Sequence, residues 1–437
     1  MKIQLISHAC VIVETVDCKI LMDPWVFSQV FNDSWTLFPE PKFEESMLAD
    51  VDFMWISHEH PDHFNIPTLR MLPESFRKHV TVLFQRNNSQ KMFEAFRRFG
   101  YSQHQALPHR EIFRLTERTE IYCYQVGQMD SCLGVRDTSG ILLNVNDAYT
   151  NVLDVNRIRD DFGSPDILLN QFSIAGYGGF EDFAVHLTEM AKGHIEHMLE
   201  THKEVGAKVT IPFASYVLFS CEDNQYINEY ANTPRSVSER FQDADAGIAV
   251  LYLGDIYDTN SAKRWDSEPA ILRYEEERKR LAEFEFDTPK PTPIETIKEA
   301  FGSICADLAE RYPSLILRLL KPVTVEIPDL ETTIRFSIAD GNFVEVAKSE
   351  QADMIVNSQP LWFAFSAPFG VQTLGVSGRF RLCNKGDSNN WARHRALFGL
   401  YNAEFYLRPK YFFTASNLGF LWARRRGLIG QLATRIA

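Results

Sequence analysis

The stretch "HEHPDH" at residues 58–63 places three histidines and an aspartate within six positions. Histidines two positions apart on a tight loop can point both imidazoles the same way, while Asp62 and His63 face a second position. Imidazole and carboxylate are ordinary ligands of divalent metals, so this pattern suits two metal ions with a water molecule between them. We therefore expect His58 and His60 to bind one metal and Asp62 and His63 to bind the other. The alternative is a polar surface loop that happens to be rich in histidine.

The segment that must position these residues is the apolar run "VDFMWIS" at 51–57. It predicts a strand buried on both faces, with the histidines at its carboxyl end, where sites of layered α/β domains lie. Other short apolar segments alternate with helical patterns such as "SQKMFEAFRRFGY" and a long helical stretch that Gly206 ends. This order of elements predicts a layered α/β domain that ends near residue 260.

A second part of the chain follows a charged helical stretch and the proline-rich break "DTPKPTP" at 287–293. Beyond the break we expect a helix, a hairpin turning at Asp340-Gly341, and strands within "ADMIVNSQPLWFAF" and "LGVSGRFRL". The predicted organisation is a catalytic α/β domain over 1–260, a connector and linker over 261–293, and an α+β domain with a basic tail over 294–437.

Composition limits the classes of protein. The net charge of −13 disfavours a nucleic-acid binder, and 45% apolar residues are typical of a globular chain. The seven cysteines include no CxxC pair, which indicates reduced thiols and a cytoplasmic location. The N-terminus lacks the layout of a signal peptide, and no run approaches the roughly 18 apolar residues of a membrane span. We therefore expect no stable membrane insertion.

On "ISHEHPDHFNIPTL", "KILMDPW" and "LLNVNDA", the sequence resembles the metallo-β-lactamase superfamily. The resemblance implies an αββα sandwich with metal ligands on loops at one edge. It also implies that Asp23 supports the histidine loop and that Asp147 bridges the two metals. For both aspartates the alternative is an ordinary turn residue after a strand.

The sequence departs from the superfamily pattern where two further histidines are expected. "YQVGQMDSCLGV" holds no histidine, so Asp130 is the best substitute there, and Cys221 stands about where the last histidine belongs. A structural aspartate and a buried inert thiol are the alternatives. His8 in "LISHAC" could line the site as a proton donor or a substrate contact, so we expect it to take part in catalysis with Asp62.

Within the superfamily, the stretches "ISHEHPDHFNIPTL", "DSCL", "LLNVNDA" and "IPFASYV" resemble the catalytic domain of CMP-N-acetylneuraminate hydroxylase-like proteins, over roughly residues 1–235. This resemblance implies oxygenation with iron. A Rieske cluster needs C-x-H ligand pairs, and the sequence has none, so electrons would come from a separate donor protein. Residues 352–382 resemble the sterol-carrier-protein fold, which encloses an apolar tunnel; packing, or formation of a homodimer, is the alternative role.

Three functions stay open. The leading hypothesis is an oxidoreductase, a diiron monooxygenase that hydroxylates a small molecule such as a sugar or natural product. Asp130 in place of a histidine makes the donors harder, which suits iron or manganese more than zinc, and 13% aromatic residues suit a dry pocket. The second is a zinc or manganese hydrolase of an ester, lactone or phosphodiester. The third is a binding protein with a degenerate site.

Overall fold

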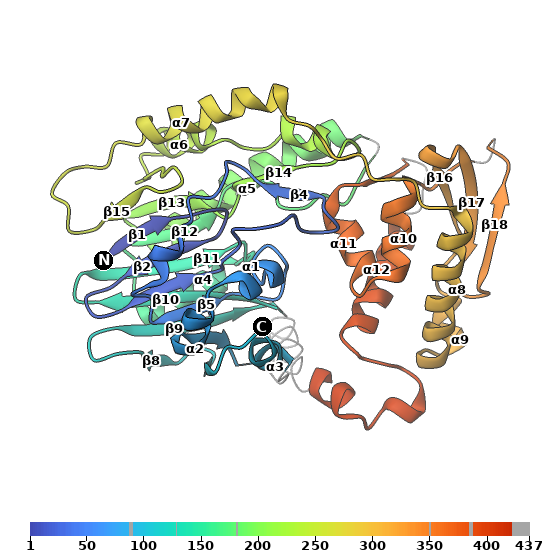
Figure 1. The fold of residues 1–437 in the computed structure, drawn as a ribbon, viewed down its shortest axis with the longest axis horizontal. Coiled ribbons are helices and arrows are strands. Elements are labelled where there is room, and N and C mark those ends of the chain that lie inside the picture. Colours follow the sequence, from blue (N-terminus) through green and yellow to red (C-terminus); the bar gives the residue numbers. More distant parts are fainter. Residues whose placement is uncertain (87–90, 128, 181, 349–350, 384–387, 422–437) are drawn as a thin grey trace.

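The computed structural model describes residues 1–86, 91–127, 129–180, 182–348, 351–383 and 388–421. In its N-terminal lobe, whose strands lie between residues 2 and 258, two sheets pack face to face with helices on their outer faces (Figure 1). This is the predicted αββα sandwich. The first sheet has the strand order β15-β1-β2-β3-β5-β6-β7 and the second β13-β12-β11-β10-β9-β8. The first consists of β1 (Lys2–Leu5), β2 (Val11–Glu14), β3 (Lys19–Met22), β5 (Phe53–Ile56), β6 (Thr81–Gln85), β7 (Gln103–Leu107) and β15 (Ile256–Asp258). The second consists of β8 (Ile112–Arg114), β9 (Glu120–Val126), β10 (Asp130–Asp137), β11 (Gly140–Asn146), β12 (Ile167–Gln171) and β13 (Val209–Phe213).

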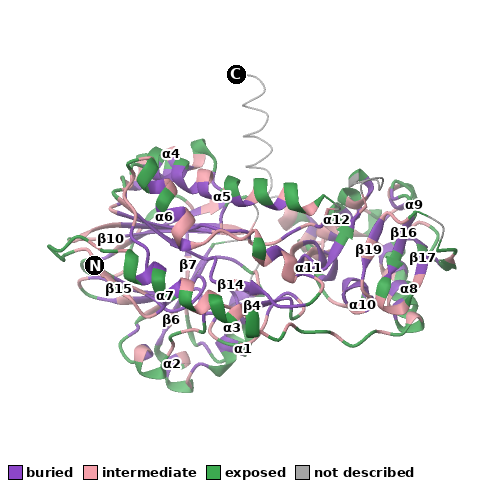
Figure 2. Ribbon diagram, turned by 90° about the horizontal axis from the view of Figure 1, so that it is seen from above, coloured by how far each residue is buried: buried purple, intermediate pink, exposed green. Residues whose placement is uncertain are grey.

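Side chains on β5 alternate between two cores, as the strand geometry requires. Trp55 points into the core between the sheets, whereas Met54 and Ile56 join a second core under the outer helices. These helices are α1 (Ile66–Met71), α2 (Glu74–His79) and α3 (Lys91–Arg98). The predicted burial of this strand on both faces is confirmed, and Figure 2 shows the buried strands beneath partly exposed helices.

The outer face of the second sheet is covered by α4 (Val152–Phe162) and α5 (Phe183–Val205). Helix α5 is the predicted long helix. It ends at Gly206, whose φ of 70° is the left-handed conformation that closes many helices. The helices cover the outer faces of the sheets, and the loops at the carboxyl ends of β3, β5 and β11 lie at one edge of the sandwich.

The C-terminal lobe, residues 294–421, has a five-stranded sheet of order β18-β17-β16-β19-β20. Its elements are α8 (Ile294–Arg311), α9 (Ser314–Leu317), β16 (Val323–Ile327), β17 (Thr332–Ser337), β18 (Asn342–Val346), β19 (Met354–Val356), α10 (Ser358–Ser366), α11 (Gly370–Ser377), β20 (Phe380–Leu382) and α12 (Ser388–Asn402). The hairpin at Asp340-Gly341 is confirmed. The strands expected in "ADMIVNSQPLWFAF" and "LGVSGRFRL" are present as β19 and β20, but the "PLWFAF" part is helical, because Leu361, Ala364 and Phe365 have helical spacing and bury one face of α10.

The core of this second lobe is dense with aromatic rings. Phe301, Phe336 and Phe365 contact one another with ring centroids 5.2 to 5.4 Å apart, so they fill the middle of this core. The helix α7 (Glu268–Lys279), in the stretch expected to connect the domains, packs on the N-terminal lobe, and its Ala270, Ile271 and Tyr274 join the core there. The division at 260 and 293 and the sterol-carrier resemblance stay predictions, and the basic tail at 422–437 lies outside the described residues. Among those described, no helix combines the length and apolar character that crossing a bilayer requires.

Candidate metal centre

Strand ends from both sheets bring the predicted ligands together. The stretch 58–63 follows β5, and Asp130 and Asp147 lie at the start of β10 and just after β11. His8 lies in the turn between β1 and β2. The histidine and aspartate donor atoms form three groups, and the atoms of each group lie within 4.8 Å of one another. The groups are His58-His60-Asp130, His8-Asp62-His63 and His58-His63-Asp147.

The first group is the more open one. His58 Nε2 lies 2.8 Å from His60 Nδ1 and 4.0 Å from Asp130 Oδ1. His58 is fully buried, but His60 is only half-buried and the Asp130 side chain is 32% exposed. His58 and His60 are the two predicted ligands of one metal, and Asp130 is the residue expected to replace the missing histidine there.

The second group is closed to solvent. Asp62 Oδ2 lies 3.4 Å from His63 Nε2 and 3.6 Å from His8 Nε2. The side chains of both histidines are 0% exposed and that of Asp62 is 4% exposed. The structure therefore brings His8 to the place beside Asp62 and His63 where a third donor is needed.

Asp147 lies between the two groups. Its Oδ2 is 3.6 Å from His58 Nε2 and 3.5 Å from His63 Nε2. One carboxylate oxygen that faces a histidine of each group is in a position to contact two metals. This arrangement agrees with the bridging role that the resemblance implied for Asp147.

Several polar atoms of this cluster are buried without a hydrogen-bond partner. In the part of the chain that the structure describes, they include both ring nitrogens of His8, His63 Nε2, Asp62 Oδ1 and Asp147 Oδ1. Buried polar atoms of this kind are costly unless something satisfies them. Two divalent ions would do so, and the mixed imidazole and carboxylate donors are of the right chemical types. The residues present therefore fit a dinuclear centre.

Asp23 supports the cluster from behind. Its Oδ2 accepts a hydrogen bond from His63 Nδ1 at 3.0 Å and one from Asn146 Nδ2 at 2.6 Å, and its Oδ1 accepts from the Ser57 backbone N–H at 2.7 Å. A carboxylate on Nδ1 orients the ring and leaves Nε2 free for a metal. These contacts agree with the supporting role expected for Asp23. Sequence reasoning missed Asn146 and Ser57, although "LLNVNDA" contains the first.

Backbone strain concentrates at the same edge. Asp23 and Asn146 have φ of 40° and 61°, in the left-handed region that residues other than glycine rarely adopt. The pairing of β11 with β12 also shifts its register between Asn144 and Asn146. Strained residues and bulges persist where the surrounding contacts hold them, and they are common at functional sites.

Opposing charges inside the cluster shift its protonation equilibria. Burial lowers the pKa of His63, but the carboxylates of Asp147, Asp62 and Asp23 outweigh burial and raise it well above its usual value. For Asp62 and Asp147 the signs are reversed: burial raises the pKa, but the neighbouring histidines outweigh burial and lower the pKa of both. In the metal-free protein, a protonated His63 thus balances part of the carboxylate charge.

The remaining histidines are held neutral. Burial lowers the pKa of His8, His58 and His60. A neutral imidazole is the form that binds a metal, whereas a proton donor must be protonated, so the position of His8 favours a ligand role. Burial and the nearby charge of Asp147 raise the pKa of Asp130 to about 6.

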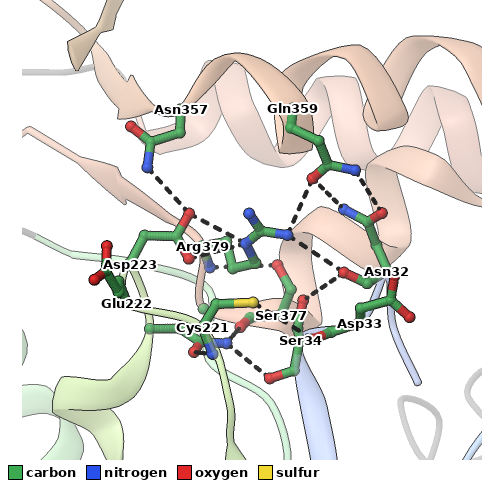
Figure 3. Close-up of polar contacts among 12 residues, drawn as sticks. Asn32, Asp33, Ser34, Cys221, Glu222, Asp223, Asn357, Gln359, Ser377 and Arg379 are labelled. Atoms are coloured by element: carbon green, nitrogen blue, oxygen red, sulfur yellow. Dashed lines mark hydrogen bonds and ion pairs between the residues drawn. The ribbon is translucent and has the colours of Figure 1, made fainter. Parts of the chain in front are cut away.

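The prediction that Cys221 completes the metal site needs correction. Its thiol belongs to none of the donor groups found among the described residues, and its Sγ donates to the Asp33 carbonyl at 3.4 Å. Burial raises the pKa of the thiol to about 12, so it stays protonated. Cys221 instead lies among residues where the two lobes meet (Figure 3). Its place in the chain suggested a ligand, but after β14 (Val217–Phe219) its side chain lies against the Asp33 carbonyl.

Aromatic side chains wall the cluster. The Trp25 ring lies edge-on to His8 with centroids 5.4 Å apart, and the Phe31 ring lies edge-on to His60 at 6.3 Å. Both side chains are buried, so they exclude water from two sides of the ligands.

Comparisons with known proteins agree with this geometry. Residues 2–133 match the family model described as a beta-lactamase superfamily domain. The cytidine monophosphate-N-acetylneuraminic acid hydroxylase of Danio rerio is 26% identical over 252 residues, covering 54% of this chain and 41% of the relative. That of Asterias rubens is 36% identical over 75 residues, covering 17% of this chain and 12% of the relative. The chain therefore spans less than half the length of these curated relatives.

Solved structures give weaker likenesses. The isothiocyanate hydrolase from Delia radicum gut bacteria has a TM-score of 0.45 at 15% identity, covering 59% of this chain and 99% of that one. CmlA, a diiron beta-hydroxylase from Streptomyces venezuelae, has a TM-score of 0.41 at 14% identity, covering 59% and 53%. Likenesses this distant do not separate hydrolysis from hydroxylation.

Proposed function

We propose that this chain, whose residues 2–133 match a beta-lactamase superfamily domain, is a dinuclear metalloenzyme that uses dioxygen to hydroxylate a small molecule. The observation that carries the proposal is the donor set. Asp130 lies beside His58 and His60, and Asp62 and Asp147 supply two further carboxylates. Three carboxylates make the set harder than one built on histidine alone, which favours iron. The names of the curated relatives, which are hydroxylases, point in the same direction.

The residues of the chain have distinct tasks in this reaction. His58, His60 and Asp130 would hold one iron, His8, Asp62 and His63 the other, and Asp147 both. When bound, the two irons would supply a redox-active site for dioxygen, while the two electrons that the hydroxylation consumes come from outside the centre. Asp23 keeps the His63 ring oriented through its Nδ1 hydrogen bond. The open side at Asp130 is where a substrate can approach, because the other ligand group is buried.

Hydroxylation of a C–H bond with dioxygen consumes two electrons and two protons and releases one water molecule. We therefore propose that a separate donor protein supplies the electrons. A cytoplasmic location, a small-molecule substrate and a homodimer likewise stay predictions, as does the absence of nucleic-acid binding.

A hydrolase with zinc or manganese is the second candidate. Four imidazoles and a shared Asp147 also fit two zinc ions, which would activate a water molecule for attack on an ester, lactone or phosphodiester. The carboxylate at Asp130 counts against this candidate.

Metal analysis of the full-length protein, purified without oxygen, separates these functions. We expect two irons per chain and an optical band that changes when dioxygen is admitted. Two zincs per chain with hydrolytic activity would replace the proposal by the second candidate. Absence of metal from the wild type would leave a degenerate site in a binding protein. His58→Ala serves as the control that must lose metal.

A further inference from the structure

A buried arginine joins the two lobes (Figure 3). Arg379, between α11 and β20, has a side chain that is 1% exposed. Its Nε donates to Asp223 Oδ1 at 2.9 Å, and its Nη1 donates to the Asn32 carbonyl at 3.3 Å and to Gln359 Oε1 at 3.1 Å. The amides of Asn32 and Gln359 also exchange two hydrogen bonds of 2.9 Å. One guanidinium of the C-terminal lobe thus contacts two separate segments of the N-terminal lobe.

One of those segments is a strained turn. Phe31, Asn32 and Asp33 are consecutive residues with φ of 55°, 61° and 57°. Each residue of this kind costs about 1–2 kcal/mol in the left-handed region, so the turn persists only where its surroundings hold it. The Asp33 carbonyl accepts from Ser220 Oγ at 3.1 Å and from the Cys221 thiol, both in the same lobe. The Asn32 carbonyl accepts from Arg379 of the other lobe at 3.3 Å and from Ser34 Oγ of its own lobe at 3.5 Å.

The turn carries Phe31, whose ring contacts the ligand His60. The histidines of the cluster differ in what orients them. His63 Nδ1 has Asp23, and His58 Nδ1 has Ser57 Oγ at 2.9 Å. Within the described ranges, the ring of His60 has hydrogen-bond or ring contacts only with His58 and Phe31. Apart from its contact with His58, the His60 ring is therefore oriented by Phe31.

We propose that Arg379 is a positioning residue for His60: by fixing the 31–33 turn, it holds Phe31 against the imidazole and tunes the His58-His60-Asp130 metal site from the second lobe. This inference rests on the proposed metal centre. Arginine suits the task because its planar fork donates in several directions at once, to Asp223, Gln359 and the backbone of the turn. The other ligand group has its own support in Asp23 and does not need the second lobe.

Cobalt titration of the full-length, metal-free protein tests the proposal, by calorimetry and by the visible absorption of bound cobalt. Arg379→Gln should weaken one of the two cobalt sites about threefold to thirtyfold and leave the other unchanged. Phe31→Leu should do the same, and the double variant should be little worse than either single variant, because both act through one contact. Arg379→Lys should recover part of the affinity, since it keeps the charge but not the fork.

A matched control separates positioning from general stability. Phe336→Leu lies in the core of the C-terminal lobe, away from the turn, and should lower Tm without changing either cobalt affinity. If Arg379→Gln and Phe336→Leu, at equal loss of Tm, change the affinities alike, Arg379 is merely structural and the inference is wrong. Equal weakening of both sites by Arg379→Gln would overturn it as well.

A second readout decides the inference even if the wild type binds no metal and the proposed function fails. In the metal-free protein, histidine ring NMR signals can be assigned with His60→Gln and His8→Gln. Arg379→Gln should shift the His60 signal and leave the His8 signal in place. An unshifted His60 signal would contradict the proposal.

Discussion

The His8-Asp62-His63 group and the His58-His60-Asp130 group share Asp147 but lie in different surroundings. The first is closed to solvent and is held by Asp23 of the same lobe, whereas Asp130 in the second is 32% exposed. One half of the centre is therefore enclosed and supported within the sandwich. The other half is open, so it can meet a substrate, and on our proposal it depends on a contact from the second lobe.

The largest effect should come from the residue that the two groups share. Asp147→Asn keeps the size of the side chain but loses its charge, so both groups should lose metal together. The loss of affinity should exceed the roughly 100-fold that removal of an outer hydrogen-bond partner costs. Elemental analysis after dialysis measures this. Loss of a single metal would show that Asp147 serves only one group.

His8 and Cys221 form a matched pair for the buried group. His8→Ala should remove one metal of the two, because it leaves Asp62 and His63 without their third donor. Cys221→Ala should leave both metals bound, since its thiol contacts the Asp33 carbonyl of the 31–33 turn and no metal ligand. If Cys221→Ala loses metal and His8→Ala does not, then Cys221 is a metal ligand and His8 is not.

Asp23→Asn should weaken the buried group alone. An amide there can no longer pair as strongly with His63 Nδ1, and loss of such a partner typically costs 10–100-fold in metal affinity. Cobalt titration should show one weakened site and one unchanged site. Equal weakening of both sites would mean that the two groups are not separately supported.

The smallest expected effect is the pH dependence of metal affinity, which should differ between the two ligand groups. The pKa of Asp130 is raised to about 6, so the carboxylate is ionised and able to bind metal above that pH and is protonated below it. Affinity of the open group should therefore fall as the pH drops through 6, by up to about tenfold per pH unit. In the buried group, the raised pKa of His63 means that metal displaces a proton near neutral pH. Calorimetry in buffers of different ionisation enthalpy measures both effects, and Asp130→Asn should abolish the first. An unchanged profile in that variant would refute the assignment.

Local patterns predicted the layered α/β domain, and the family resemblance implied its αββα order; the metal ligands stay predictions that the structure brings together in one cluster. "VDFMWIS" had to be buried on both faces, and the histidines at its end then had to lie at the edge where other strand ends meet. The role of Cys221 could not be predicted in this way. Its spacing in the chain resembled a ligand position, but the tertiary path after β14 places it at the contact between lobes. His8 was noticed, yet only the folded turn between β1 and β2 shows that it faces Asp62.

The contribution of the second lobe was also beyond local patterns. No periodicity links Arg379 to the turn at 31–33, since their contact spans the two lobes and joins residues far apart in the chain. The prediction of a strand in "PLWFAF" is wrong because tertiary packing, again, decides the local structure. Short apolar runs fit a strand or a helix equally, and the packing of Leu361 and Phe365 decides for α10.

Anomalous diffraction at the iron and zinc absorption edges, from crystals of the full-length protein loaded anaerobically, would identify the two metals and their ligands. We expect two iron peaks, one contacted by His58, His60 and Asp130 and one by His8, Asp62 and His63, with Asp147 touching both. A single peak, a zinc signal at these positions, or a peak contacted by Cys221 would contradict the account.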